Sequence, residues 1–260
     1  GVAFGIETNG DFDTAGRSVK FDYKSNFKNT SALMIKNFYR DAGKDFWITR
    51  DNLTAPFIKK PANYGTQIQF MGPSSNRFSY GLTVAREKGS EWFSALGFSK
   101  TYTAMVNFTP RDNLKFSLMY QHNDEKDWLN WIEDNLLGIY AKKQRTTVAS
   151  MNWFGGEKHE LRIKAQMVAF TARDPSAYLG DGGGDLTAVD IDLSPFSLSD
   201  LAFQIRYRYE ILPLAYLYVV YSKGGRIVES DEEDRLDKLY QRPWNDPQAD
   251  NFTVKLRYRF

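Results

Sequence analysis

The sequence predicts an all-β fold, a transmembrane antiparallel up-and-down β-barrel of about twelve strands. Apolar and polar residues alternate in segments of about 9–11 residues, the length that a tilted strand needs to cross a bilayer. These segments are joined by connections that alternate between short and long. Mean hydropathy is −0.51, and no apolar run approaches the ~20 residues of a membrane helix. A helical membrane protein is therefore excluded, whereas a barrel is not.

The last segment of the chain alternates most strictly and ends on an aromatic residue. Its apolar positions are Phe252, Val254, Leu256, Tyr258 and Phe260, and polar residues stand between them. An edge strand of a soluble sheet can also alternate, but termini usually fray and seldom end in this way. The ending resembles the signal read by the bacterial barrel-assembly machinery. We therefore favour a membrane barrel over a soluble β protein and assign these five residues to the assembly signal.

Counting back from the C-terminus gives an even number of strands, with both termini on the periplasmic side. The expected strands are 2–9, 17–26, 32–40, 64–71, 78–87, 91–108, 113–121, 137–153, 159–170, 200–210, 215–227 and 250–260. Residues 45–52 are a further candidate strand. The chain is expected to be one domain, 1–260. If it is the C-terminal part of a longer barrel, the strand count rises.

The connections between strands predict the orientation. Residues 109–112, 155–158 and 211–214 read as tight turns, whereas 122–136, 171–200 and 229–249 read as long polar loops. Short periplasmic turns and long external loops are typical of bacterial outer-membrane barrels. The predicted location is the outer membrane of a Gram-negative cell.

Composition agrees with this location and excludes other classes. The 15 Tyr, 19 Phe and 6 Trp are the residues that form aromatic girdles at membrane interfaces. The near balance of 34 basic and 32 acidic residues gives no reason to expect a nucleic-acid partner. The absence of cysteine fits an oxidising compartment. The usual serine, metal and phosphate motifs are also missing, so we expect no enzyme activity and no cofactor.

Basic residues recur on the polar positions of the strands, close to the expected periplasmic turns. If the apolar positions face lipid, these side chains face the lumen: Lys115, Arg162, Lys164, Arg206, Arg208, Lys255, Arg257 and Arg259. A ring of cations inside a low-dielectric wall favours anions. The alternative is that Glu160, Glu210 and other carboxylates neutralise these charges in a packed polar network.

Three groups of loop residues are weaker candidates. Carboxylates that could bind a divalent cation, or simply belong to a surface loop, are Asp181, Asp185, Asp190 and Asp192. The acidic run 229–234 is either a solvated loop or a place where divalent cations are shared with lipopolysaccharide phosphates. Trp128, Trp131 and Trp244 are expected in external loops, where they stack on sugars or lie at the membrane interface.

Several stretches resemble one family of large bacterial outer-membrane proteins. In that family a domain like carbohydrate-binding module family 9 precedes a C-terminal barrel of unknown function. The resemblance lies in MNWFGGEKHELRIK at 151–164, FQIRYRY at 203–209, LYVVYSKGG at 217–225 and VKLRYRF at 254–260. It covers roughly the second half of the chain and implies an outer-membrane barrel. It implies no established activity and supplies no functional residues.

The favoured function is a porin-like channel or transport conduit for small polar solutes, either anionic or sugar-like. The alternative is a non-transport scaffold that anchors or exports a surface partner. An outer-membrane hydrolase comes third, with His122 as the only catalytic candidate. Expected partners are outer-membrane lipid and lipopolysaccharide, the barrel-assembly machinery, and a surface or periplasmic protein.

Overall fold

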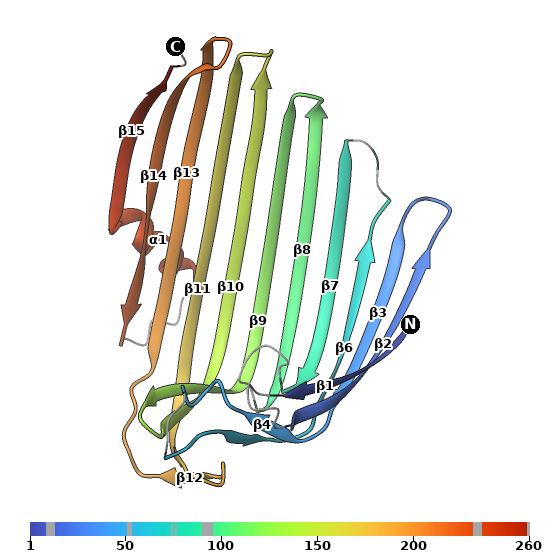
Figure 1. Ribbon diagram of the computed structural model, residues 1–260, viewed down its shortest axis with the longest axis vertical. Coiled ribbons are helices and arrows are strands. Elements are labelled where there is room, and N and C mark those ends of the chain that lie inside the picture. Colours follow the sequence, from blue (N-terminus) through green and yellow to red (C-terminus); the bar gives the residue numbers. More distant parts are fainter. Residues whose placement is uncertain are drawn as a thin grey trace.

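The computed structural model describes residues 1–8, 14–50, 54–73, 75, 77–89, 96–230 and 236–258. It is built from one large antiparallel sheet with the strand order β1-β2-β3-β6-β7-β8-β9-β10-β11-β13-β14-β15 (Figure 1). Each strand in this order pairs with the next strand of the sheet along the chain, which is the up-and-down arrangement. The prediction of an all-β, antiparallel up-and-down fold is confirmed.

Each of the twelve expected segments coincides with one strand of this sheet. The first six are β1 (Val2–Thr8), β2 (Thr14–Asn26), β3 (Ala32–Arg40), β6 (Asn63–Met71), β7 (Phe78–Lys88) and β8 (Phe98–Arg111). The last six are β9 (Leu114–Glu133), β10 (Leu136–Gly155), β11 (His159–Gly180), β13 (Phe196–Leu212), β14 (Ala215–Glu229) and β15 (Ala249–Arg257). Among the described residues β1 and β15 do not pair with each other, so the sheet is open at both edges.

Smaller elements lie in the connections. β4 (Gly43–Asp45) and β5 (Ile58–Lys60) form a two-stranded sheet, and β12 (Leu186–Val189) pairs with β11. The candidate strand at 45–52 is wrong: only Asp45 belongs to a strand, and 47–50 form a turn, while 51 and 52 lie outside the described residues. The connection between β14 and β15 contains a helix, α1 (Leu236–Asn245), which the sequence reading treated as loop.

The expected long loop at 122–136 is also wrong. β9 continues to Glu133 and β10 begins at Leu136, so a tight turn joins them. His122 pairs with Arg145, and Asp124 pairs with Lys143, in an unbroken ladder. Residues 121–127 are polar on both faces because the strands continue past the apolar part of the sheet. The polarity was therefore mistaken for a loop. Residues 171–180 and 196–200 were also expected to lie in a loop, but they extend β11 and β13.

The connections differ between the two ends of the sheet. At the end drawn uppermost in Figure 1 they are short, comprising 27–31, 72–77, 112–113, 156–158 and 213–214, and β15 also ends there. We call this the turn end. At the opposite end, the loop end, the connections 41–62, 181–195 and 230–248 are long, whereas the β9–β10 turn is short.

The two faces of the sheet differ in polarity. Strand pairing places Tyr80, Val106, Leu118, Ala149, Ala165 and Phe203 in one row across six strands. Their neighbours along each strand point to the other face. Side chains of the apolar face remain open to the surroundings: Leu118 is 50% exposed and Leu256 is 61% exposed. This apolar belt is continuous across the sheet, an arrangement that water-soluble monomers rarely expose.

Buried apolar clusters are confined to two small places in the described part of the chain. One lies at the loop end and contains Ile58, Leu129 and Leu137. The other lies beneath α1 and contains Ala169, Leu236 and Leu239. In the described residues no helix has the length and apolar character required to cross a membrane.

Candidate functional site on the polar face of the sheet

The predicted basic residues lie on the face opposite the apolar belt, toward the turn end. Arg162 is directly opposite Arg206, and Lys164 is opposite Gln204. Lys115 and Arg162 both flank Asn152 of β10. Lys255 and Arg257 face Tyr218 and Tyr216 of β14. Pairing thus collects seven side chains, which we call the basic zone: Lys115, Arg162, Lys164, Arg206, Arg208, Lys255 and Arg257. The eighth predicted member, Arg259, lies outside the described residues.

One carboxylate offsets part of this charge. Glu160 is buried and forms ion pairs with Arg162 and Arg208. The Nη2 atom of Arg208 lies 3.0 Å from the Oε2 atom of Glu160. The other five basic side chains make no ion pair among the described residues. The polar network considered as the alternative therefore exists at Glu160, but it does not extend over the whole zone. Positive charge remains in excess.

Tyrosines line the basic zone near the last strands. The guanidinium of Arg206 lies 5.3 Å from the ring centre of Tyr218, and that of Arg208 lies 5.3 Å from Tyr216. Such contacts hold cations against ring faces. These tyrosines, Arg208 and Arg257 line a hollow of about 570 Å³. The Nε atom of Arg208 is buried there without a hydrogen-bond partner.

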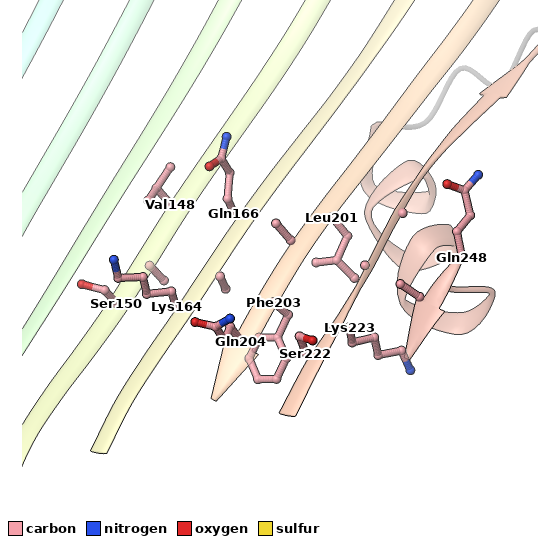
Figure 2. A pocket seen from close by; sticks show the side chains of 16 residues that line it. Val148, Ser150, Lys164, Gln166, Leu201, Phe203, Gln204, Ser222, Lys223 and Gln248 are labelled. Carbon is pink, nitrogen blue, oxygen red and sulfur yellow. The ribbon is translucent and has the colours of Figure 1, made fainter. Parts of the chain in front are cut away.

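A second hollow lies next to the basic zone, over β10, β11, β13 and β14, with a volume of about 760 Å³. Figure 2 shows its lining, in which one row of polar side chains runs across the strands: Ser150, Lys164, Gln204 and Ser222. Ser117 of β9 continues the row, and its Oγ lies 2.7 Å from that of Ser150. The row of polar side chains therefore extends from Lys164 of the basic zone across the neighbouring strands.

The loop-end half of the polar face is lined mostly by neutral hydrogen-bonding groups. A hollow of about 230 Å³ is surrounded by amides and hydroxyls, with two carboxylates: Gln67, Thr83, Ala85, Glu87, Ser99, Thr101, Thr103, Gln121, Asn123, Glu125, Gln144 and Thr146. We call this the amide–hydroxyl zone. Thr101 Oγ1 donates to Asn123 Oδ1 at 3.1 Å, and Asn123 Nδ2 donates to Glu125 Oε1 at 2.5 Å. The sequence analysis did not identify this zone because its members become neighbours only through strand register.

A buried ion pair closes the amide–hydroxyl zone toward the loop end. Lys142 Nζ lies 3.6 Å from Glu125 Oε2, and both side chains are almost fully buried. The ammonium also lies 4.7 Å from the ring centre of Trp128. Both residues lie beyond the apolar belt. Burial lowers the pKa of the Lys142 ammonium group, and the Glu125 carboxylate opposes that shift.

The described residues of the predicted assembly signal belong to the apolar face of β15. Phe252, Val254, Leu256 and Tyr258 are 70%, 56%, 61% and 50% exposed, so the belt is wide open at this edge. Phe260 lies outside the described residues. Phe203, on the same face two strands away, is partly covered because Trp244 of α1 packs against it at 5.2 Å between ring centres.

The predicted metal ligands do not assemble into a metal site. Asp181 Oδ1 accepts the backbone N–H groups of Gly183 and Asp185 and so stabilises a turn. Asp185 pairs with Lys59 of β5 at 2.7 Å. Asp190 and Asp192 line a separate surface hollow. Among the described residues no group of three or more acidic or histidine side chains could hold a metal ion.

The remaining candidates lie in different settings. His159 Nδ1 is 2.6 Å from the Tyr207 hydroxyl, at the turn end. His122 stacks on Tyr102 on the face of the belt and not on the polar face. Trp128 and Trp131 are in β9 and not in a loop, and Trp131 lies under the Arg50 guanidinium at 4.1 Å. Trp244 belongs to α1.

Comparison with known proteins gives a distant structural likeness. No family model and no curated protein matches the chain. The crystal structure of BauA, the ferric preacinetobactin receptor from Acinetobacter baumannii, aligns with 98% of this chain at 9% sequence identity and a TM-score of 0.44. The chain spans 43% of the length of that receptor. A likeness at this level carries no functional conclusion, and the family resemblance described above stays a prediction.

Proposed function

We propose that this chain forms a wall of an outer-membrane β-barrel and that its polar face lines a conduit for small polar solutes, with a preference for anions. The observation that carries the proposal is the opposition of the two faces. An exposed apolar belt covers one side of the sheet, and a basic zone with excess positive charge occupies the turn-end part of the other. Cations on a wall that excludes water from its other side attract anions strongly, because the low dielectric concentrates their field.

A conduit requires a closed wall. In lipid every backbone N–H and C=O must be paired, so the open edges at β1 and β15 pair with each other or with further strands. The number of strands then sets the width of the lumen. The proposed solutes are small and polar because the exposed hydroxyl, amide and basic groups of the polar face can replace their water contacts.

The proposal is tested by measuring ion preference in planar bilayers. The double variant Arg206→Glu, Arg257→Glu places two carboxylates in the basic zone, and we expect the preference for anions over cations to fall or reverse. The matched control, Lys28→Glu with Lys158→Glu, makes the same change in net charge at exposed residues of turn-end connections. We expect its ion preference to stay close to that of the parent protein. An open channel whose preference is equal in both variants would contradict the proposal.

A scaffold for a surface partner is the second candidate. The observation in its favour is that β9, β10 and β11 extend past the belt and carry ordered structure, including β12. Trp47, in the connection between β4 and β5, is 88% exposed. A barrel without measurable conductance, from which a copurifying surface protein is lost on Trp47→Ala, would favour the scaffold over the conduit.

A further inference from the structure

The apolar belt meets a polar border toward the loop end. Along β7, β8 and β9 its continuous apolar run ends at Val84, Tyr102 and Tyr120. The next residues on the same face are Arg86, Lys100 and His122, and Phe98 follows beyond Lys100 on β8, with its ring centre 4.8 Å from the Arg86 guanidinium. At about 3.3 Å per residue, this border lies within ~7 Å of the belt along the strands. If the belt spans the acyl chains, the border residues therefore lie at the level of the lipid headgroups.

Basic side chains gather at this border. Arg86 pairs with Lys100, Lys100 with Asp124, and Asp124 with Lys143, which places all four in one row across β7 to β10. Arg145 lies in the adjacent row, opposite His122. We call Arg86, Lys100, Lys143 and Arg145 the basic rim. Neighbouring strands are ~4.8 Å apart, so these charges are close enough to contact one headgroup together.

Two observations indicate that the rim is built to receive an anion. Within the described part of the chain, none of the four cations makes an ion pair, and Arg86, Lys100 and Lys143 are exposed. In addition, the Nε atom of Arg145 and the Nδ1 atom of His122 are buried without a hydrogen-bond partner. An unpaired buried donor is costly. An anionic oxygen that accepted the Arg145 N–H would remove that cost through a charge-assisted hydrogen bond.

The helix α1 forms one side of this region on the same face of the sheet. Leu236 and Leu239 pack on Ala169, and the Tyr240 hydroxyl lies 3.3 Å from Thr147 Oγ1. Thr147 is two residues from Arg145 on β10, so Tyr240 stands beside the rim. A helix with one apolar side, lying on the belt at its polar border, has the position of an interfacial helix.

We propose that the basic rim binds the phosphate groups of an anionic glycolipid in the outer leaflet, such as diphosphorylated lipid A. Arg145 donates to a phosphate oxygen, Lys100 and Lys143 supply charge, and the acyl chains lie on the apolar belt below them. Asp124 lies between Lys100 and Lys143. Because its carboxylate repels anions, the phosphates bind on either side of it. The inference rests on the proposed placement in the outer membrane and not on the conduit.

The test measures lipid binding to the purified protein in a neutral detergent. The parent protein is titrated with diphosphorylated lipid A and with the same lipid after removal of its phosphates. We expect the phosphorylated form to bind at least tenfold more tightly. The variant Lys100→Gln, Lys143→Gln removes two exposed charges from the rim. Because each basic residue near an anionic surface contributes about 1 kcal/mol, we expect its affinity for diphosphorylated lipid A to fall about tenfold or more.

The matched control is Lys24→Gln with Lys36→Gln, which removes two exposed lysines from the polar face of β2 and β3. We expect its lipid affinity to stay within about twofold of the parent protein. Equal affinity for the two lipids, or equal loss in the two double variants, would overturn the proposal. Displacement of the lipid by millimolar inorganic phosphate would also overturn it, since the site would then be one for free phosphate. Conductance measured on the same variants keeps a failure of this inference separate from a failure of the conduit.

Discussion

The basic zone and the amide–hydroxyl zone carry their charges differently. In the basic zone one buried carboxylate, Glu160, forms ion pairs with two arginines, and the other cations have no acidic partner among the described residues. At the border of the amide–hydroxyl zone the ammonium group of Lys142 is buried against Glu125, beside a set of neutral polar groups. Charge on this face therefore acts in two ways. At the turn end it produces a field, and at the loop end it holds strands and aromatic rings together.

The largest effect is expected at the buried pair of the loop end. Glu125→Gln removes the buried carboxylate that faces the Lys142 ammonium, and removal of one partner of a buried ion pair costs about 3–5 kcal/mol in comparable cases. We expect a loss of this order in the free energy of unfolding, measured by urea titration in lipid vesicles. The double variant Glu125→Leu, Lys142→Met replaces both charges with apolar groups and should recover most of the loss. A single variant as stable as the parent protein would show that this pair does not stabilise the loop end.

A smaller loss of stability and a clear change in ion preference are expected at Glu160. Glu160→Gln removes the negative charge but keeps the shape of the side chain, and Arg162 and Arg208 are partly exposed. Loss of a charged hydrogen-bond partner costs about 1.5–3 kcal/mol. Bilayer recordings should show a stronger preference for anions than in the parent protein. A weaker preference would mean that the basic zone does not face the conduit.

The smallest effect is expected from the tyrosines that cover the arginines. Tyr218→Leu removes the ring beneath Arg206, a contact worth about 0.5–1 kcal/mol at an exposed site. We expect a stability loss within that range, measured by the same urea titration, and a small change in ion preference. A loss several times larger would show that Tyr218 has a packing role beyond its contact with Arg206.

The sequence alone predicted the strands where the two faces differ in polarity. In β15 the alternation of Phe252, Val254 and Leu256 with polar residues indicates a strand that has one apolar face and one polar face. The end of β9 was missed because residues 121–127 are polar on both faces, and such a segment has no period-2 signal. Strand count and topology could therefore be predicted, whereas strand length could not.

The helix α1 carried a signal that was overlooked. Leu236, Leu239 and Tyr240 follow the spacing of one helix face, and Trp244 continues it. The acidic run before the helix suggested a loop. Among the charged residues, the basic zone followed from alternation alone. The partner of Lys142, the amide–hydroxyl zone and the basic rim depend on strand register, which no local pattern specifies.

The proposed conduit requires that the apolar belt faces lipid while the polar face lines water. The chain contains no cysteine, so a spin label can be attached at single introduced cysteines at Leu118, Leu256, Ser117 and Thr253 in protein reconstituted into lipid vesicles. Labels at Leu118 and Leu256 should collide mainly with oxygen dissolved in the bilayer. Labels at Ser117 and Thr253 should collide mainly with a water-soluble nickel chelate. Labels at Leu118 and Leu256 that are instead reached from water, or shielded from both reagents in a packed interior, would contradict the claim.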